Sequence, residues 1–510
     1  MQSWPSILVK MKFLQSIGLA ATAAALVSAV PTAQDASAKI ARDLPLVESN
    51  KLRRVLLRSE LLKKAAHLEG LAYATPNRNR LIGTPGHQAT IDWIKSIIGG
   101  FSDYYTIYEQ KFTLSLGVSA NLTNNAVPME VFAVGLAPAG DVTGPLVYVP
   151  NLGCTTADFA KVTPGSIVLV GRGNCKSGIK DALASTAGAV GMLVYNNVEG
   201  SLEGYGLQLI ATKEGSYVPA GGISMAEGKA LQARVEAGET VVAHLSTTTE
   251  DTDTYNVIAE TIAGDHDNVI FMSGHSDSVA AGPGINDNGS GTISLLEVAT
   301  QLTKFSVKNA VRFAWWAAEE EGLLGADYYV SQASQSELDK IRLMLDFDMM
   351  ASPNYAYQVY DGDGSAYGES GPPGSAEAEH EFERYFAQEA GLNFTTIEFD
   401  GRSDYGPFLA AGVATGGIAC GAEGIKTVEE AAMFGGKAGV AYDVCYHSAC
   451  DNASNVNVGA WIQMTKAIAH MTATFARSFD LLPPKTVQAK AKRMAMAKAM
   501  SDKATGKLDW

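Results

Sequence analysis

The sequence predicts an α/β fold in which a central mixed β-sheet is flanked by helices, with a β-rich domain inserted into it. Two observations lead to this fold class. From about residue 254, apolar runs of strand length alternate with longer amphipathic runs, which is typical of a sheet covered by helices. Residues 126–247 instead carry short β-rich runs punctuated by glycine and proline, which indicates a smaller domain of different character.

The length and charge of the chain restrict its class further. A chain of 510 residues is longer than one that folds around a single hydrophobic core, so two or three domains are expected. The formal net charge is −15, while basic side chains gather near the N-terminus and in a basic C-terminal tail at 481–510. The middle of the chain is therefore more acidic than the whole, which argues against nucleic acid as a partner. We expect a monomer.

The N-terminus has the pattern of an export signal. From Met11, a basic residue (Lys12) precedes an apolar run that ends in small residues, which predicts a cleaved signal peptide within residues 1–33. A membrane anchor is the alternative, but the run is short and rich in alanine. We therefore expect a secreted protein, or one of the vacuolar lumen, that is not held in a membrane after cleavage.

Residues 34–125 hold the first part of the α/β domain and, in one interpretation, a short propeptide. The segment 37–62 contains the dibasic pair Arg53 and Arg54, where a propeptide could be cut. The same segment has the amphipathic spacing of a first helix. Both interpretations stay open from the sequence.

The cysteines and sequons fit an exported protein. Cys154 and Cys175 are close in sequence, as are Cys445 and Cys450, so two local disulfides are expected. Cys420 is left as a buried thiol. Asn-X-Ser/Thr sequons occur at Asn121, Asn288, Asn393 and Asn452. We expect glycans on Asn121 and Asn393, and none on Asn288, which lies among the candidate metal ligands.

The expected elements follow from the spacing of apolar residues. Helices are predicted at 90–98, 176–187, 226–237, 291–303, 320–332, 376–389 and 458–475, and strands at 255–262, 268–273, 310–317 and 344–350. The α/β region at 248–480 should therefore form the larger domain. Ligands of such sheets bind at the carboxyl ends of the strands.

The segment FMSGHSDSVAAGPGINDNGSG carries the first candidate ligands. His275 should end a buried strand, and Asp277 could accept the second ring N–H of His275, which fixes the tautomer of a metal-bound histidine. Asp287 lies in a glycine-rich loop before a helix, where both of its oxygens can bind metal. A lone histidine would indicate only a polar strand end, but this combination favours a metal site.

Three further segments complete the candidate set. A strand in VRFAWWAAEEEGLLG ends in three glutamates, and carboxylates beside an apolar run are costly unless they are paired or bind metal. One of them can bind metal while its neighbour acts as a general base. The alternative is a charge cluster at a helix N-terminus. In LMLDFDMMASPN, Asp348 is a better ligand than Asp346 because it lies at the strand end.

The last segment, DVCYHSACDN, places Tyr446 and His447 between two cysteines whose disulfide would fix the histidine. Histidines and carboxylates together form a nitrogen and oxygen donor set that suits two zinc ions sharing one carboxylate. This preference for zinc over cobalt or manganese depends on ligand type. The candidate ligands are His275, Asp287, Glu320, Asp348 and His447.

The segments GHSDSV, GINDNGSG, WWAAEEEGLLGADYYV, FDMMASPN, GRSDYGPF and CYHSACD resemble the two-zinc aminopeptidases of peptidase family M28. The motif resemblance covers about residues 254–480. Residues 126–247 resemble the protease-associated (PA) domain that several such enzymes carry as an insertion. Its role could be that of a lid over the active site or of a passive insertion.

The resemblance implies a role for each candidate residue. His275 and Asp348 would bind one zinc ion, Glu320 and His447 the other, and Asp287 would bridge them. Glu319 would be the general base, Asp277 would orient His275, Tyr446 would stabilise the oxyanion, and Arg402 would lie near the amino end of the substrate. A cis peptide bond between Asp287 and Asn288 is also implied. Glu321 departs from the family pattern, because many relatives have an apolar residue at this position. The general base could therefore be a glutamate one position away from Glu319.

The implied activity is removal of N-terminal residues, preferably hydrophobic ones such as leucine, from peptides with free N-termini. A carboxypeptidase or a glutaminyl cyclase of the same family is the alternative. A carboxypeptidase should have an arginine patch, which we do not find, and a cyclase would usually lack the inserted domain. A non-catalytic binding protein would be expected to have lost ligands, whereas all five are present.

Overall fold

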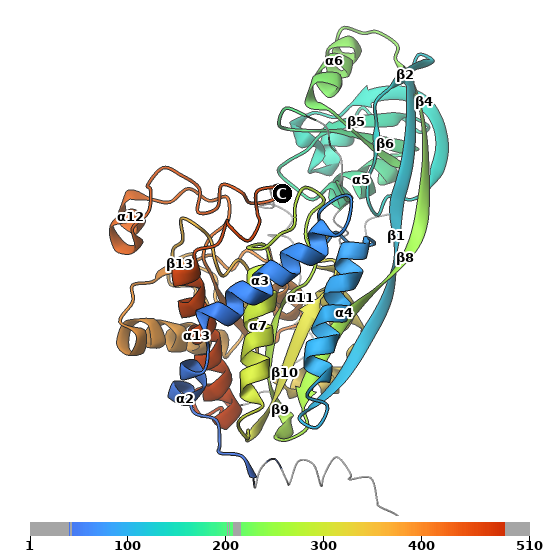
Figure 1. Ribbon diagram of the computed structural model, residues 1–510. Helices are drawn as coiled ribbons and strands as arrows, with labels where there is room; N and C mark the ends of the chain where they lie inside the picture. Colours follow the sequence, from blue (N-terminus) through green and yellow to red (C-terminus); the bar gives the residue numbers. More distant parts are fainter. Residues whose placement is uncertain (1–39, 41–42, 201, 203–204, 208–215, 485–510) are drawn as a thin grey trace, which may run out of the picture.

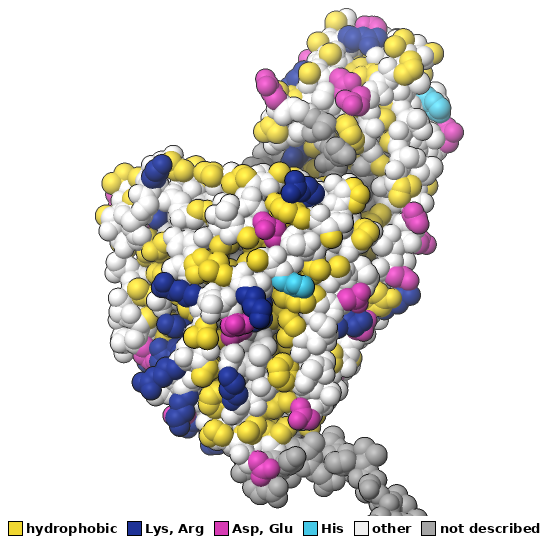
Figure 2. All heavy atoms as spheres, in the orientation of Figure 1, with side chains coloured by type: hydrophobic (Ala, Val, Ile, Leu, Met, Phe, Trp, Pro, Cys, Tyr) yellow, Lys and Arg dark blue, Asp and Glu magenta, His cyan; other side chains and the backbone are white. Residues whose placement is uncertain are grey.

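The computed structural model describes residues 40, 43–200, 202, 205–207 and 216–484 (Figure 1). The predicted signal peptide and nearly all of the basic tail lie outside these residues. Figures 1 and 2 show two lobes, the smaller one above the larger one. In the described part of the chain, no helix is both long and apolar enough to cross a membrane.

The larger lobe is built on a mixed sheet, as the sequence predicts. Strands β9, β10, β11 and β14 run parallel to one another, β12 and β8 pair antiparallel to this group, and β13 forms one edge. Their bounds are β8 Val242–Thr261, β9 Asp265–His275, β10 Asn309–Trp316, β11 Ile341–Phe347, β12 Gln358–Tyr360, β13 Thr395–Ile397 and β14 Thr415–Ala419.

Helices cover both faces of this sheet. Successive strand residues point to opposite sides, so the apolar side chains of each face are buried under a layer of helices. Ile270 and Met272 pack in the core with α7 and α13, whereas Phe271 packs on the other side with Tyr329 and Phe408. The helices are α2 Ser49–Arg54, α3 Arg58–Tyr73, α4 Pro85–Gly99, α7 Gly289–Leu302, α8 Leu324–Gln332, α9 Gln335–Lys340, α10 Ser375–Arg384, α11 Tyr405–Ala410, α12 Val428–Phe434 and α13 Val458–Arg477, with a π-helix at Tyr385–Ala390.

The smaller lobe consists of shorter strands and two helices. Its strands are β3 Phe132–Ala133, β4 Gly140–Tyr148, β5 Ile167–Gly171, β6 Gly191–Tyr195 and β7 Ala220–Ile223, and its helices are α5 Ser177–Thr186 and α6 Met225–Glu236, with 3-10 turns at Asn151–Gly153 and Thr156–Phe159. Strands β5 and β6 are buried along their whole length. This lobe therefore has a core of its own.

Two long strands join the lobes. β1 (Tyr105–Asn124) pairs antiparallel with β8 along nearly its full length, and the short β2 (Val127–Met129) extends the pair. The first half of β8 pairs with β4 and the second half with β10. One continuous sheet of 14 strands therefore runs through both lobes in the described residues.

Several predicted elements differ in their bounds. The strand expected at 255–262 is the end of the much longer β8, whose polar middle part at 248–253 is not buried but pairs with β1. The helix expected at 320–332 begins only at Leu324, because Ala318, Gly322 and Leu323 have positive φ angles. The segment expected to form a first helix is divided into α2 and α3.

The N-terminal segment 44–56 is integrated into the larger lobe. The backbone N–H of Val47 donates to Ser306, and the Val47 carbonyl accepts a hydrogen bond from Arg477. Leu52 of α2 is fully buried in the same core as α13. The dibasic pair thus lies on a helix that packs against the larger lobe.

Candidate metal centre

The candidate ligands meet at the carboxyl edge of the parallel strands. His275 is the last residue of β9, Glu319 and Glu320 follow the end of β10, and Asp348 follows β11. The carboxyl ends of adjacent parallel strands lie side by side, so residues far apart in the sequence come together here.

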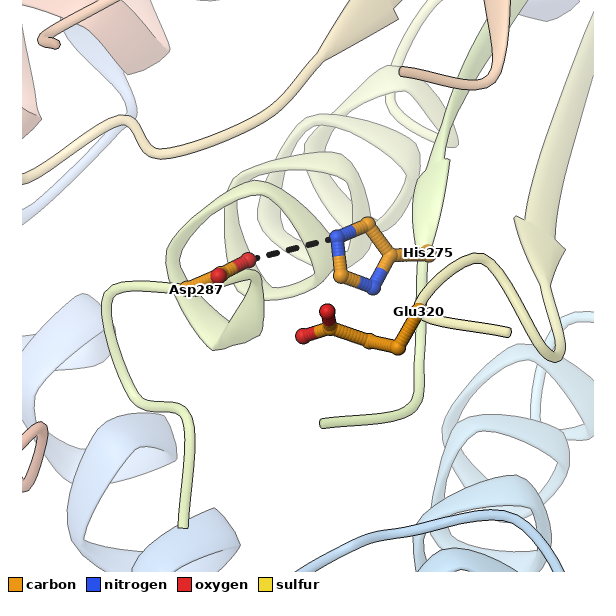
Figure 3. Close-up of side chains that lie close together, drawn as sticks. All are labelled: His275, Asp287 and Glu320. Atoms are coloured by element: carbon orange, nitrogen blue, oxygen red, sulfur yellow. Dashed lines mark ion pairs between the residues drawn. The ribbon is translucent and has the colours of Figure 1, made fainter. Parts of the chain in front are cut away.

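His275 lies at the middle of the group and is fully buried. Its Nε2 lies 3.4 Å from Oδ1 of Asp287, 3.5 Å from Oδ1 of Asp348 and 3.8 Å from Oε2 of Glu319. His275, Glu319 and Asp348 form one group of donor atoms within 4.8 Å of one another, and His275, Asp287 and Glu320 form another. Figure 3 shows the carboxylates of Asp287 and Glu320 pointing toward the imidazole of His275.

Asp287 connects the two histidines. While its Oδ1 faces His275, its Oδ2 lies 3.1 Å from Nε2 of His447, which is also 3.1 Å from Oε2 of Glu320. The peptide bond between Asp287 and Asn288 is cis, as the resemblance implied. Asn288 then caps helix α7 by accepting the N–H of Gly291. The two oxygens of Asp287 thus face different histidines.

Asp277 lies behind the ligands. Its Oδ1 is 3.6 Å from Nδ1 of His275, on the side of the ring that faces away from the other carboxylates. The same carboxylate accepts the backbone N–H groups of Glu319 and Glu320, both at 3.3 Å. One buried side chain therefore lies beside the histidine and accepts hydrogen bonds from the loop that carries two other candidate residues.

The charges of the group are unbalanced without cations. Burial lowers the pKa of His447, but the neighbouring carboxylates Glu320 and Asp287 outweigh this effect and raise it to about 10. Burial raises the pKa of the Glu319 carboxyl, and Glu320 and Asp404 raise it further against the opposing charge of His275. Buried oxygens of Glu319, Glu320 and Asp348 have no hydrogen-bond partner in the described chain. Metal cations would satisfy these atoms, and the nitrogen and oxygen donors fit zinc.

Tyr446 and Arg402 lie beside the group. The ring of Tyr446 stacks on that of His447, with centroids 3.8 Å apart, and its hydroxyl lies 3.4 Å from Nη2 of Arg402. Arg402 also forms an ion pair with Glu423 at 2.8 Å. Both residues predicted to contact substrate therefore lie together on the His447 side.

The cysteines and sequons have the expected surroundings. Disulfides join Cys154 to Cys175 and Cys445 to Cys450, and Cys420 is a buried free thiol. Among the sequons, the side chains of Asn121 and Asn393 are exposed, whereas Asn288 is fully buried.

Two residues that hold the loops of the candidate metal ligands were not predicted from the sequence. Asp451 accepts the backbone N–H groups of Asn286 and Asp287 and so holds the loop of the central carboxylate. Arg80 is fully buried and donates to the carbonyl oxygens of Ser276, Pro283 and Gly284. Asp451 lies within the last quoted motif and could have been suspected there, whereas no local pattern distinguishes Arg80.

Comparison with known proteins shows the family of the chain. Residues 256–472 match the model of peptidase family M28, and residues 142–231 match the PA domain. The chain is 45% identical to leucine aminopeptidase 2 of Arthroderma otae over 87% of its length and 89% of the relative. It is also 45% identical to the probable leucine aminopeptidase 2 of Aspergillus fumigatus, over 89% of its length and 91% of the relative.

Solved structures have the same fold. An aminopeptidase from Aneurinibacillus sp. strain AM-1 superimposes with a TM-score of 0.64 at 24% identity, covering 87% of this chain and 98% of that one. A zinc aminopeptidase from Bacillus subtilis gives a TM-score of 0.62 at 22% identity, over 84% and 96% of the two chains. By its sequence similarity along nearly the whole chain, the protein belongs to peptidase family M28.

Proposed function

We propose that this protein, a zinc-dependent aminopeptidase, hydrolyses the first peptide bond of peptides with a free N-terminus by means of two zinc ions. The observation that carries the proposal is the position of Asp287 between His275 and His447, with one oxygen toward each. A shared carboxylate between two histidines is the arrangement expected for two metal ions. The relatives named leucine aminopeptidase support the choice of substrate.

In this proposal the ligands are divided between two zinc ions. His275 and Asp348 would hold one ion, Glu320 and His447 would hold the other, and Asp287 would be shared between them. Zinc bound by these residues would lower the pKa of a water molecule and polarise the scissile carbonyl group. Asp277 keeps the ring of His275 in the orientation that exposes Nε2 to the metal.

The remaining residues handle protons and charge. Glu319 accepts a proton from the attacking water and returns it to the leaving amine, which suits a carboxylate whose pKa is raised by burial. The hydroxyl of Tyr446 donates a hydrogen bond to the oxyanion that forms on the substrate carbonyl. Arg402 holds this hydroxyl in position and lies near the amino end of the substrate.

Several finer assignments belong to the same proposal. We propose that the enzyme is secreted after cleavage of the signal peptide within 1–33, that it acts as a monomer, and that it prefers hydrophobic N-terminal residues such as leucine. Glycans on the exposed Asn121 and Asn393 would be consistent with export. The domain bounds proposed are 126–247 for the PA domain and 248–480 for the main part of the peptidase domain.

The test compares leucine anilide with N-acetyl-leucine anilide, each with and without a zinc chelator, followed by return of zinc. Cleavage of the free amine alone, abolished by the chelator and restored by zinc, is the expected result. Equal cleavage of the acetylated substrate would refute N-terminal recognition. Absence of any cleavage by the zinc-loaded protein would refute the peptidase assignment and favour a cyclase, carboxypeptidase or binding function.

A further inference from the structure

A third group of carboxylates lies outside the metal centre. Asp361 and Asp363 follow strand β12, and Glu379 lies on helix α10. One oxygen of each lies within 4.8 Å of the others. Strand β12 is separated from β9, which carries His275, by β14 and β11. The group thus belongs to a different part of the sheet from the candidate zinc ligands.

Two of the three carboxylates are buried. Asp361 is 0% exposed and Glu379 is 3% exposed, whereas Asp363 is partly open to solvent. Oδ2 of Asp361 accepts the backbone N–H groups of Ala366 and Tyr367, but its Oδ1 is buried and accepts no hydrogen bond in the described chain. A buried carboxylate oxygen without a donor is costly unless a cation is bound nearby.

The group has little positive charge around it. Among the described residues, the sole ion pair of these carboxylates joins Asp363 to His380 at 3.4 Å, and the His380 side chain is 59% exposed. Burial raises the pKa of Glu379 to about 7, with the charges of Asp363 and Glu383 adding to it and a hydrogen bond from the Asp363 N–H opposing it. Glu379 therefore behaves as a carboxylate that lacks a cationic partner.

The ligand chemistry favours calcium. Asp361 and Asp363 match the first two alternating ligands of the Asp-x-Asp-x-Asp/Asn calcium loop, and the third position is Ser365 instead of Asp or Asn. The match ends at Ala366, where the common loop has glycine, and Glu379 contributes its carboxylate from a helix instead. All donors are oxygens, which disfavours zinc, and calcium accepts the irregular coordination that a partly open loop provides.

We propose that Asp361, Asp363 and Glu379 bind one calcium ion that connects the loop 361–371 to helix α10. The loop is closed by a hydrogen bond from the N–H of Gly371 to the carbonyl of Gly362. Just before it, the ring of Tyr360 packs on Phe399 and Tyr405. The ion would therefore stabilise the sheet edge that adjoins the motif containing Arg402, and its role is structural.

The direct test is equilibrium dialysis of the zinc-loaded full chain against radioactive calcium, with zinc present throughout. We expect one calcium ion per chain and at least a tenfold loss of affinity in Asp361→Asn and in Glu379→Gln. Both substitutions keep an oxygen that can accept the existing backbone N–H groups. If Asp361→Asn fails to fold, Glu379→Gln alone decides the question.

Glu383→Gln is the matched control, because it removes a charge from the same helix without removing a member of the group. Glu383→Gln should bind calcium as tightly as the unaltered protein does. Calcium should raise the midpoint temperature of thermal unfolding of the unaltered protein and of Glu383→Gln. It should leave the midpoint temperature of Asp361→Asn unchanged. The proposal is refuted if the unaltered protein binds no calcium, if Asp361→Asn and Glu379→Gln bind it normally, or if Glu383→Gln weakens binding equally. Displacement of calcium by equimolar magnesium would also refute it.

Discussion

The carboxylate of Glu321 occupies the space beside Gly206, where a Cβ atom would lie only 2.3 Å from Oε2. Glu321 directly follows the candidate base and ligand, whereas Gly206 belongs to the smaller lobe. Nearby, Ala317 and Ala318 of the larger lobe share a hydrophobic cluster with Val134. The two lobes thus contact each other next to the metal centre, at the residue where the sequence departs from the family pattern.

A double-mutant cycle tests this contact. Gly206→Ala should lower the free energy of unfolding by about 1 to 3 kcal/mol, because the added methyl group overlaps the Glu321 carboxylate. In a Glu321→Ala background the same change should cost much less, since the overlapping oxygen is gone. Urea unfolding of the four zinc-loaded proteins measures the coupling. Equal costs in both backgrounds would show that the two residues do not interact.

Glu319→Gln should separate catalysis from metal binding. We expect kcat on leucine anilide to fall about 10²- to 10⁴-fold, because the amide cannot accept the proton of the attacking water. Zinc content, measured by mass spectrometry after dialysis, should remain unchanged. Glu320→Gln is the matched control and should lose zinc. A Glu319→Gln protein that loses zinc while Glu320→Gln keeps it would mean that base and ligand are assigned one residue off.

The disulfide between Cys445 and Cys450 should matter for metal binding. The loop that it closes carries His447, whose φ angle of 52° is unusual for a residue other than glycine. Replacing both cysteines by serine should weaken zinc affinity about 10-fold, in the range typical of residues that support a metal ligand. The control removes Cys154 and Cys175 in the same way. Similar zinc affinities in a competition titration of the two variants would contradict the prediction.

Stability should fall in acid through Glu381, which lies on α10 away from the metal centre. Burial acts to raise its pKa, but hydrogen bonds from Arg384 and His470 and their charges lower it to about 2. Because this pKa lies below the unfolded value, the stabilisation is present above about pH 4.5 and is lost as the pH falls toward 2.

Glu381→Gln should therefore lower the free energy of unfolding at pH 7 by up to about 3 kcal/mol, and the difference from the unaltered protein should shrink below pH 4. Urea unfolding between pH 3 and pH 7 provides the measurement. The exposed Glu429→Gln serves as control and should change little at any pH. A difference that is constant with pH would exclude the titration of Glu381 as its cause.

The fold class and the membership in family M28 could be predicted from the sequence, because the evidence for them is local. Three candidate ligands, His275, Glu320 and Asp348, lie at or just after the end of an apolar run, so strand ends and ligands were found together. Boundaries were less predictable. The turn at 318–323 interrupts a helix pattern through positive φ angles that the sequence does not reveal, and β8 continues through a polar stretch because β1 pairs with it.

Residues that act through long-range contacts were not predictable. Arg80 reaches carbonyl groups about two hundred positions away in the chain, and only the folded backbone brings these together. The contact of Glu321 with Gly206 likewise depends on how the two lobes lie against each other. Local patterns therefore indicate which residues can bind metal, while the residues that hold them in place depend on tertiary structure.

The pairing of β1 with β8 has a consequence for how the protein can be divided. Each strand contributes one half to either lobe, so a cut at the lobe boundary would sever both strands in mid-course. In the truncated larger lobe the remaining halves of β1 and β8 would still pair with each other, but each strand would end in mid-course. The smaller lobe therefore cannot be removed without shortening both strands, and a truncated larger lobe would need a new turn to join their cut ends.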